Sequence, residues 1–228
     1  MSTIADNVSQ VDERIRAAAL AAQRDPSTIG LLAVSKTKPA AALREAFAAG
    51  LRDFGENYLQ EALSKQLELA DLPLCWHFIG PIQSNKTRAI AEHFAWVHSV
   101  DRLKIAQRLS EQRPAELPPL NICIQVNVSG EASKSGSTPD DLPALAAAIS
   151  ALPRLTLRGL MAIPEPTEDS AEQNAAFATV RRLQDSLNLP LDTLSMGMSH
   201  DLEAAIAQGA TWVRIGTALF GARDYGQP

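Results

Sequence analysis

Two cationic side chains lie in short apolar runs, one near each end of the chain. Lys36 ends the run GLLAVSK (30–36), and Arg214 lies in the run WVRIGT (212–217). A lysine amine can condense with an aldehyde to form a Schiff base, and an arginine in an apolar run is costly unless it is paired or bound to a ligand. The pair therefore indicates a candidate ligand site, although a lysine at a strand end is more often a solvated surface charge.

Glycine and hydroxyl residues in two turns are suited to binding a phosphate group. The turn GMSHD (197–201) contains Gly197 and Ser199, and Gly216 and Thr217 follow the run that holds the arginine. Glycines let backbone N–H groups approach an anion closely, and hydroxyl groups add hydrogen bonds. Taken alone, both turns are ordinary sequences, so they indicate a phosphate site only if the fold brings them near the lysine.

These parts together suggest pyridoxal 5′-phosphate as the ligand, held by Lys36 as a Schiff base. The same residues also suit a Schiff-base aldolase that acts on a phosphorylated sugar. This reaction needs an acid/base network around Lys36, and none is identifiable in the sequence. If Arg214 lies beside the pyridine nitrogen, that nitrogen stays unprotonated. The ring is then a weak electron sink, which restricts its chemistry to mild proton transfers or to none.

The elements that must position these residues follow a regular alternation of apolar runs and helical patterns. The predicted strands are 30–36, 52–57, 76–80, 96–100, 121–128, 155–163, 192–197 and 212–217. Strands that alternate with helices imply a parallel sheet, and eight such units in 228 residues favour a single (β/α)8 TIM barrel of the α/β class. Active sites of these barrels lie at the C-terminal ends of the strands, which would gather Lys36, Asn57 and the two turns.

Strand periodicity also predicts which way the arginine points. Successive side chains of a strand face opposite sides, so Arg214 and Gly216 share one face while Val213 and Ile215 share the other. The apolar pair suits the side that packs on helices, which places Arg214 inside the barrel. Lys38, in the loop after the first strand, is interpreted as a solvated charge.

The remaining chain is predicted to complete one domain spanning residues 1–228. Residues 4–24 have the spacing of an amphipathic helix, so the segment 1–25 is expected to pack on the barrel. Little chain follows the eighth strand, so its helix must be short or absent. The stretch SGEASKSGSTPDD (129–141) is predicted to be a mobile loop, in which Lys134 is either a solvated charge or a second amine near the pocket.

Composition excludes several classes of function. The net charge of −5 argues against nucleic-acid binding, and no apolar run approaches the roughly 20 residues of a membrane-spanning helix. The two cysteines lie in apolar runs and are predicted to be reduced thiols of a cytoplasmic protein. The four histidines show no metal-ligand spacing, and His77 and His98 are interpreted as satisfied core or rim residues.

Several blocks of the sequence resemble the pyridoxal phosphate homeostasis proteins, also called the proline synthase co-transcribed family. The blocks run in order from about residue 30 to residue 224, which makes the resemblance far more specific than any block alone. They are AVSKTKP, FGENYLQE, WHFIGPIQSNK, HSVDR, SKSG, LRGLMAIP, LSMGMSHD and VRIGTALFGAR. The resemblance implies a barrel similar to the N-terminal domain of alanine racemase, in the fold-type III class of pyridoxal phosphate proteins.

The resemblance also assigns expected roles. Lys36 matches the Schiff-base lysine, Arg214 the residue near the pyridine nitrogen, and Asn57 a residue lining the cofactor. The phosphate-binding positions match Ser199, Gly216 and Thr217. His200 departs from the serine or acidic residue of many relatives, which puts the local affinity in doubt rather than the function.

Three functions are weighed on these residues. Family members are thought to buffer pyridoxal phosphate and deliver it in vitamin B6 homeostasis, without established enzymatic activity, so pyridoxal phosphate and apo-enzymes that require it are the expected partners of a monomeric protein. An amino-acid racemase is the alternative. It needs acid/base groups on both faces of the cofactor, and the racemases take a tyrosine from a C-terminal domain that we do not expect here, although Tyr58 is a possible substitute. A phosphosugar lyase is the third reading.

Overall fold

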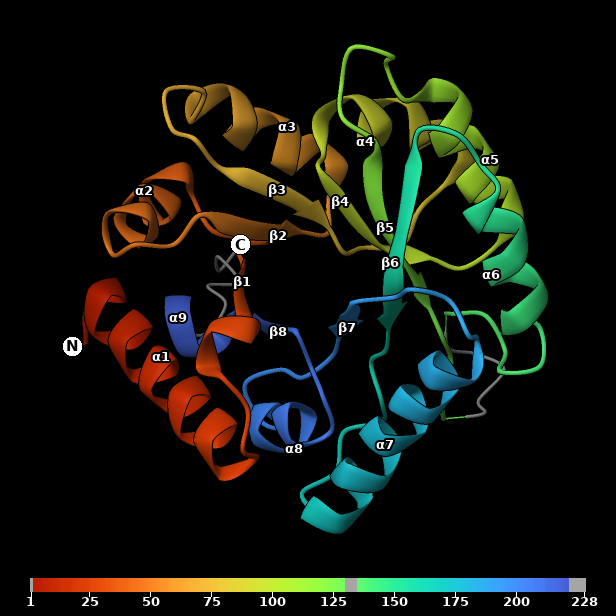
Figure 1. Cartoon of the computed structure of the whole chain (residues 1–228). Helices are drawn as coiled ribbons and strands as arrows, with labels where there is room; N and C mark the ends of the chain where they lie inside the picture. The colour runs from red at the N-terminus through yellow and green to blue at the C-terminus, as the bar shows by residue number, and fades with distance from the viewer. Residues whose placement is uncertain (1, 130–134, 222–228) are drawn as a thin grey trace, which may run out of the picture.

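The strands form a closed parallel barrel with helices around it (Figure 1). The computed structural model describes residues 2–129 and 135–221. In chain order the strands are β1 (Gly30–Val34), β2 (Asp53–Glu56), β3 (Cys75–Phe78), β4 (Trp96–Val100), β5 (Leu120–Gln125), β6 (Leu155–Met161), β7 (Thr193–Ser195) and β8 (Trp212–Ile215). Each strand pairs with its neighbours in sequence, and β8 closes on β1 through pairs such as Leu32 with Arg214. The predicted (β/α)8 TIM barrel is confirmed.

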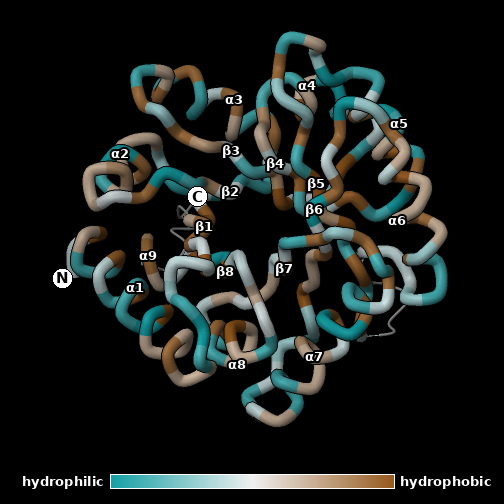
Figure 2. The backbone as a smooth tube through the Cα atoms, viewed as in Figure 1, coloured by the Kyte–Doolittle hydropathy of each residue, from teal (hydrophilic) through white to brown (hydrophobic). Residues whose placement is uncertain are grey.

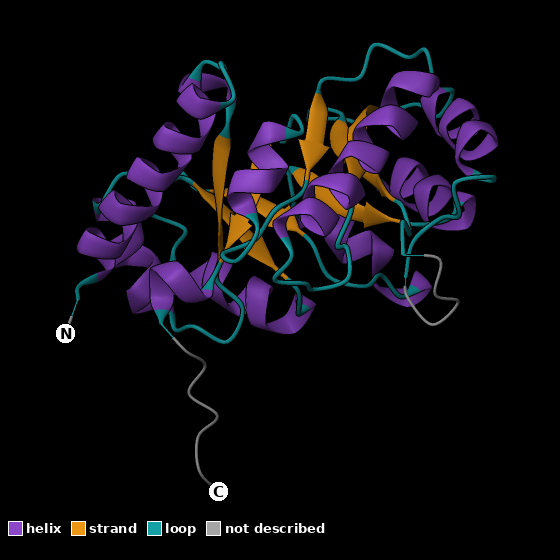
Figure 3. Cartoon of the chain, turned by 90° about the horizontal axis from the view of Figure 1, so that it is seen from below, coloured by secondary structure: helices purple, strands orange, loops and turns teal. Residues whose placement is uncertain are grey.

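Helices connect successive strands and lie outside the barrel (Figure 3). They are α1 (Ile4–Ala21), α2 (Ala40–Ala48), α3 (Leu59–Glu68), α4 (Thr87–His93), α5 (Leu103–Gln112), α6 (Leu142–Ser150), α7 (Ser170–Ser186), α8 (Leu202–Ala207) and α9 (Thr217–Phe220). Two short 3₁₀ turns lie at Pro26–Thr28 and Ser84–Lys86. The helix after β8 has four residues, as expected from the little chain that follows this strand.

The N-terminal helix α1 takes the place beside α8 and α9 where a longer eighth helix would lie (Figure 1). Thr3 and Asp6 form a reciprocal capping box that satisfies backbone N–H groups at its start. Its buried residues recur at spacings of three and four: Val8, Val11, Ile15 and Ala19. Apolar and polar colours accordingly alternate along this helix (Figure 2). The helix ends at Ala21 rather than at residue 24, and it packs on α2 as well.

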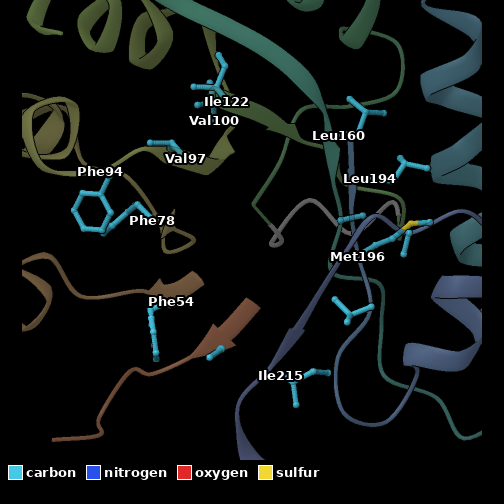
Figure 4. Packing of buried hydrophobic residues seen from close by; sticks show 14 of the residues in the cluster. Phe54, Phe78, Phe94, Val97, Val100, Ile122, Leu160, Leu194, Met196 and Ile215 are labelled. Carbon is cyan, nitrogen blue, oxygen red and sulfur yellow. The ribbon is translucent and has the colours of Figure 1, made fainter. Parts of the chain in front are cut away.

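The core consists of an outer layer between strands and helices and a more polar interior. Ten labelled residues of the outer layer come from strands β2 to β8 and the segments next to them (Figure 4). Side chains of opposite parity point into the barrel, where Trp96, Cys123 and Met161 form a separate apolar cluster. Polar side chains also point into the interior, and one of them, Ser195, accepts a hydrogen bond from Arg214.

Some expectations differ from the structure at the strand ends. The first strand ends at Val34, so Ser35 and Lys36 lie in the turn that follows it rather than in the strand. This turn forms because Ser35 makes contacts described below. Residues 130–134 of the predicted mobile loop, including Lys134, lie outside the described residues, and the single domain over 1–228 stays a prediction. In the part of the chain that the structure describes, no helix combines the length and apolar character needed to cross a membrane.

Candidate functional site

A cavity of about 190 Å³ lies at the C-terminal end of the barrel. It brings together all six residues singled out in the sequence: Lys36, Asn57, Ser199, Arg214, Gly216 and Thr217. Val34, Ile79, Ile163, Met198 and His200 complete its lining. These residues come from the ends of β1, β2, β3, β6, β7 and β8 or the segments after them. Tyr58 does not line the cavity, and 54% of the residue's surface is exposed.

The turn that carries Lys36 is anchored on both sides of this residue. The buried Ser35 hydroxyl donates to Glu56 Oε1 at 2.6 Å, and the Ser35 carbonyl accepts a hydrogen bond from Lys65 Nζ at 2.7 Å. On the other side, the Thr37 N–H donates to Glu61 Oε1 at 2.6 Å. Thr37 adopts a φ of 64°, a left-handed conformation that costs free energy for a residue with a Cβ. The anchors therefore hold the lysine in a turn that the chain would not adopt alone.

Glu56, Glu61 and Lys65 form a charged cluster behind this turn, between β2 and α3. The side chains of Glu56 and Lys65 are 0% and 5% exposed, and Glu56 Oε1 lies 2.7 Å from Lys65 Nζ. Burial raises the pKa of Glu56, and the nearby Lys65 ammonium opposes this rise. The cluster is outside the cavity, so its role is to hold the turn rather than to contact a ligand.

Arg214 enters the cavity from inside the barrel, as the strand periodicity predicts. Its guanidinium donates from Nη1 to Ser195 Oγ at 2.8 Å and from Nη2 to the Ala162 carbonyl at 2.9 Å. Val213 and Ile215 face the other way and are fully buried in the outer layer. Burial lowers the pKa of Arg214 to about 10, and attraction to Asp201 opposes this shift. The guanidinium therefore keeps its charge at neutral pH.

The two turns that follow β7 and β8 are shaped by glycines. Gly197 has a φ of 97°, and a Cβ there would lie 2.6 Å from the Ala205 Cβ. The next residue, Met198, donates its N–H to Asp201 Oδ1 at 2.6 Å, which closes the turn. Gly216 packs on β1, where a Cβ would lie 3.2 Å from the Val34 carbonyl oxygen. These close approaches shape the two turns whose residues Ser199, Gly216 and Thr217 line the cavity.

Helix α1 braces these turns, a contact that sequence reasoning missed. Arg14 donates from Nη2 to the Ser199 carbonyl at 3.1 Å and pairs with Glu203 through the same guanidinium. Asn7 Nδ2 donates to the Leu219 carbonyl of α9 at 2.8 Å. The interpretation of Lys38 as a solvated charge is wrong, because its Nζ donates to the Phe220 carbonyl at 3.0 Å. The correction arises because α9 ends beside the loop after β1.

We expect Arg14→Ala to weaken ligand binding in the cavity while leaving the fold nearly as stable. The lost hydrogen bond frees the Ser199 segment, and ordering it again on binding would cost about 1 kcal/mol, or about fivefold in affinity. The Arg14–Glu203 pair is half-exposed and contributes little to stability. Titration of the ligand expected from the sequence, pyridoxal phosphate, measures the effect by absorbance, with Arg16→Ala on the exposed face of α1 as the matched control. Equal affinities of the two variants would refute the bracing role.

A second group of reactive side chains lies at the opposite end of the barrel. The donor atoms of Asp53, Cys75 and His77 lie within 4.8 Å of one another. Sequence spacing did not reveal the group, because it depends on the pairing of Asp53 with Cys75 across β2 and β3. His77 is fully buried and hydrogen-bonded to Asp53, so its interpretation as a satisfied core residue is confirmed.

The chain has close relatives of known family. The family model of the alanine racemase N-terminal domain matches residues 2–224. A pyridoxal phosphate homeostasis protein of Pseudomonas aeruginosa is 80% identical over 228 residues, which cover 100% of this chain and 99% of the relative. A protein of the same description from Escherichia coli K12 is 55% identical over 235 residues. This match covers 99% of this chain and 99% of the relative.

Among solved structures, PipY from Synechococcus elongatus with PLP bound is 44% identical, with a TM-score of 0.84. The match covers 96% of this chain and 100% of PipY. Alanine racemase from Corynebacterium glutamicum shares the fold at a TM-score of 0.68 and 18% identity, over 99% of this chain and 62% of the racemase. The chain therefore belongs to the alanine racemase N-terminal domain family and, within it, to the pyridoxal phosphate homeostasis proteins.

Proposed function

We propose that this protein binds pyridoxal 5′-phosphate reversibly and stores it for enzymes that require the cofactor. The proposal depends most on one observation, which is that Lys36, Arg214, Ser199 and Thr217 line a single cavity. The description of the relatives as pyridoxal phosphate homeostasis proteins supports it, as does the PLP bound to PipY.

The residues of the cavity fit the chemical groups of this cofactor. When bound, pyridoxal phosphate supplies an aldehyde that condenses with the Lys36 amine to a Schiff base, with loss of water. Ser199, Gly216 and Thr217 are assigned to the phosphate. Asn57 Oδ1 is buried without a hydrogen-bond partner in residues 2–129 and 135–221, which makes it available to a donor on the ligand.

Arg214 limits the reactivity of the stored cofactor in this proposal. Its guanidinium has only donors, and Ser195 and Ala162 hold it in place. A pyridine nitrogen held beside this fixed cation would accept a hydrogen bond from it and would stay unprotonated. The ring is then a weak electron sink, which suits a protein that stores the cofactor.

An amino-acid racemase is the alternative that the structure favours less. Racemisation needs acid/base groups on both faces of the cofactor, and Tyr58 was the candidate for the second one. Tyr58 lies outside the cavity lining with 54% of its surface exposed. We also identify no acid/base network for a phosphosugar lyase in the described lining of the cavity. The cytoplasmic location, the monomeric state and delivery to apo-enzymes stay predictions.

Transfer of the cofactor to an acceptor tests the proposal. Protein loaded with pyridoxal phosphate and freed of excess is mixed with an apo-enzyme that requires it. We expect the visible absorbance of the loaded protein to fall while the activity of the enzyme rises. Retention of the cofactor with no gain in activity would contradict delivery. Turnover of alanine at enzyme-like rates by the loaded protein, lost in Lys36→Ala, would contradict the storage role.

A further inference from the structure

A line of hydrogen-bonded side chains runs through the barrel from Arg214 to the opposite end. Arg214 Nη1 donates to Ser195 Oγ at 2.8 Å, and Ser195 Oγ lies 2.7 Å from His98 Nδ1. His98 Nε2 lies 2.9 Å from His77 Nδ1, and His77 Nε2 lies 3.0 Å from Asp53 Oδ1. The five residues come from β8, β7, β4, β3 and β2, so the line crosses the interior rather than following one strand.

Most of this line is shielded from water. Ser195, His98 and His77 are 0% exposed and Arg214 is 5% exposed, whereas the Asp53 side chain is 30% exposed. The ring of Trp96 stacks on His77 with 5.5 Å between the ring centres, and Trp212 packs against His77 in a T-shaped arrangement. Burial lowers the pKa of both imidazoles, so we take both as neutral at neutral pH.

The donors and acceptors fit one direction along the line. A guanidinium can only donate, so Ser195 Oγ accepts a hydrogen bond from Arg214. The Ser195 hydroxyl then donates its own hydrogen bond to His98 Nδ1. His98 then carries its proton on Nε2 and donates to His77 Nδ1. His77 in turn carries its proton on Nε2 and donates to the Asp53 carboxylate. Every donor in this arrangement meets an acceptor, with a cation at one end and an anion at the other.

The reverse direction leaves groups unmatched. It places the imidazole protons on Nδ1, so that Ser195 Oγ accepts hydrogen bonds from both His98 and Arg214. The Ser195 hydroxyl proton then has no acceptor among the residues of the line. It also requires a donor at His77 Nε2, either a protonated Asp53 or the thiol of Cys75, whose Sγ lies 3.4 Å away. The Asp53 carboxylate therefore favours the first direction, because it accepts the last hydrogen bond of the line, from His77 Nε2.

We propose that Asp53 is a positioning residue for Arg214, acting through the tautomers of His77 and His98 and the hydroxyl of Ser195. The carboxylate at the N-terminal end of the barrel thus fixes how the guanidinium is presented to the cavity at the other end. The direction of the hydrogen bonds depends on the protein's own side chains and needs no ligand. The effect of this direction on cofactor binding rests on the proposed function.

The direct test is ¹⁵N NMR of the full chain labelled at histidine. Substitution of the two histidines outside the line, His93→Gln and His200→Gln, leaves the two buried signals. We expect both buried imidazoles to be neutral with the proton on Nε2. In Asp53→Ala we expect a share of the Nδ1 tautomer at His77 and His98. Asp53→Glu retains a carboxylate, which can only accept, and should restore the wild-type tautomers. Unchanged signals in Asp53→Ala, or Nδ1 protons in the wild type, would overturn the proposal.

A divalent cation held by Asp53, Cys75 and His77 is the competing explanation of the same geometry. A metal would bind the Nε2 lone pair of His77 and move the proton to Nδ1. The spectra are therefore compared after a chelator and after added Zn²⁺. Identical spectra support the hydrogen-bonded line. If the untreated protein shows the Nδ1 form and the chelator converts it to the Nε2 form, the metal explanation holds instead.

The second readout is the binding of pyridoxal phosphate. We expect Asp53→Ala to weaken binding about fivefold and shift the visible band, with recovery in Asp53→Glu. Ser195→Ala breaks the line next to Arg214 and should reproduce the shift, which provides a second variant if Asp53→Ala fails to fold. Normal binding and an unshifted band in both alanine variants would contradict the positioning role. A wild type that shows the expected tautomers but binds no pyridoxal phosphate would contradict the proposed function alone.

Discussion

Lys36→Ala is expected to abolish the visible absorbance of the protein mixed with pyridoxal phosphate. In the proposed function the band comes from a Schiff base, and Lys36 is the lysine that lines the cavity within the described residues. The remaining parts of the cavity, including Arg214 and the hydroxyl groups of Ser199 and Thr217, stay in place. We therefore expect weaker, non-covalent binding to persist, which equilibrium dialysis can measure separately from the spectrum.

The matched control for this experiment is Lys104→Ala, which removes an exposed lysine on α5. This variant should keep the full band, because its side chain lies on a helix remote from the cavity lining. A band of wild-type intensity in Lys36→Ala would show that another amine forms the Schiff base. That result would refute the assigned role of Lys36 while leaving the fold unaffected.

Lys65→Met is expected to lower the free energy of unfolding by about 3–5 kcal/mol. The substitution removes the ammonium that pairs with Glu56 and leaves a fully buried carboxylate without its counter-charge. It also removes the hydrogen bond from Lys65 Nζ to the Ser35 carbonyl, next to Lys36. Urea unfolding followed by circular dichroism measures the loss of stability, and the band of bound pyridoxal phosphate reports on the turn.

Two variants separate the explanations of this loss. Glu56→Gln combined with Lys65→Met removes the buried charge and should recover part of the stability, because an uncharged amide is less costly to bury. Lys104→Met controls for the exchange of an exposed lysine on a helix. A Lys65→Met protein as stable as this control would contradict the account of the cluster as the anchor of the turn.

Much of the fold and the candidate site could be predicted from the sequence, because both follow from local patterns. The alternation of apolar runs and helical spacing identifies the eight units, and barrel geometry then places strand ends together. The face of Arg214 follows from the two-residue period of β8. The resemblance to a known family selected pyridoxal phosphate from the ligands that the residues left open, and it added the expected role of Asn57, which spacing alone does not reveal.

The contacts that hold the site could not be predicted, because they depend on register and on distant packing. Lys65 reaches the Ser35 carbonyl only because β1 and β2 pair so that α3 lies behind the turn. Arg14 reaches Ser199 across 185 positions of sequence, through the packing of α1 on α8. His98 meets Ser195 across the barrel interior, which no local pattern records.

The most direct test of the central claim is reduction of the loaded protein with borohydride, followed by peptide mass mapping. Borohydride reduces a Schiff base to a stable amine, so the cofactor stays attached to the residue that held it. The account predicts one pyridoxyl group on the peptide that contains Lys36 and loss of the visible band. Attachment chiefly to Lys38, to Lys134 or to any other lysine, or no attachment at all, would contradict it.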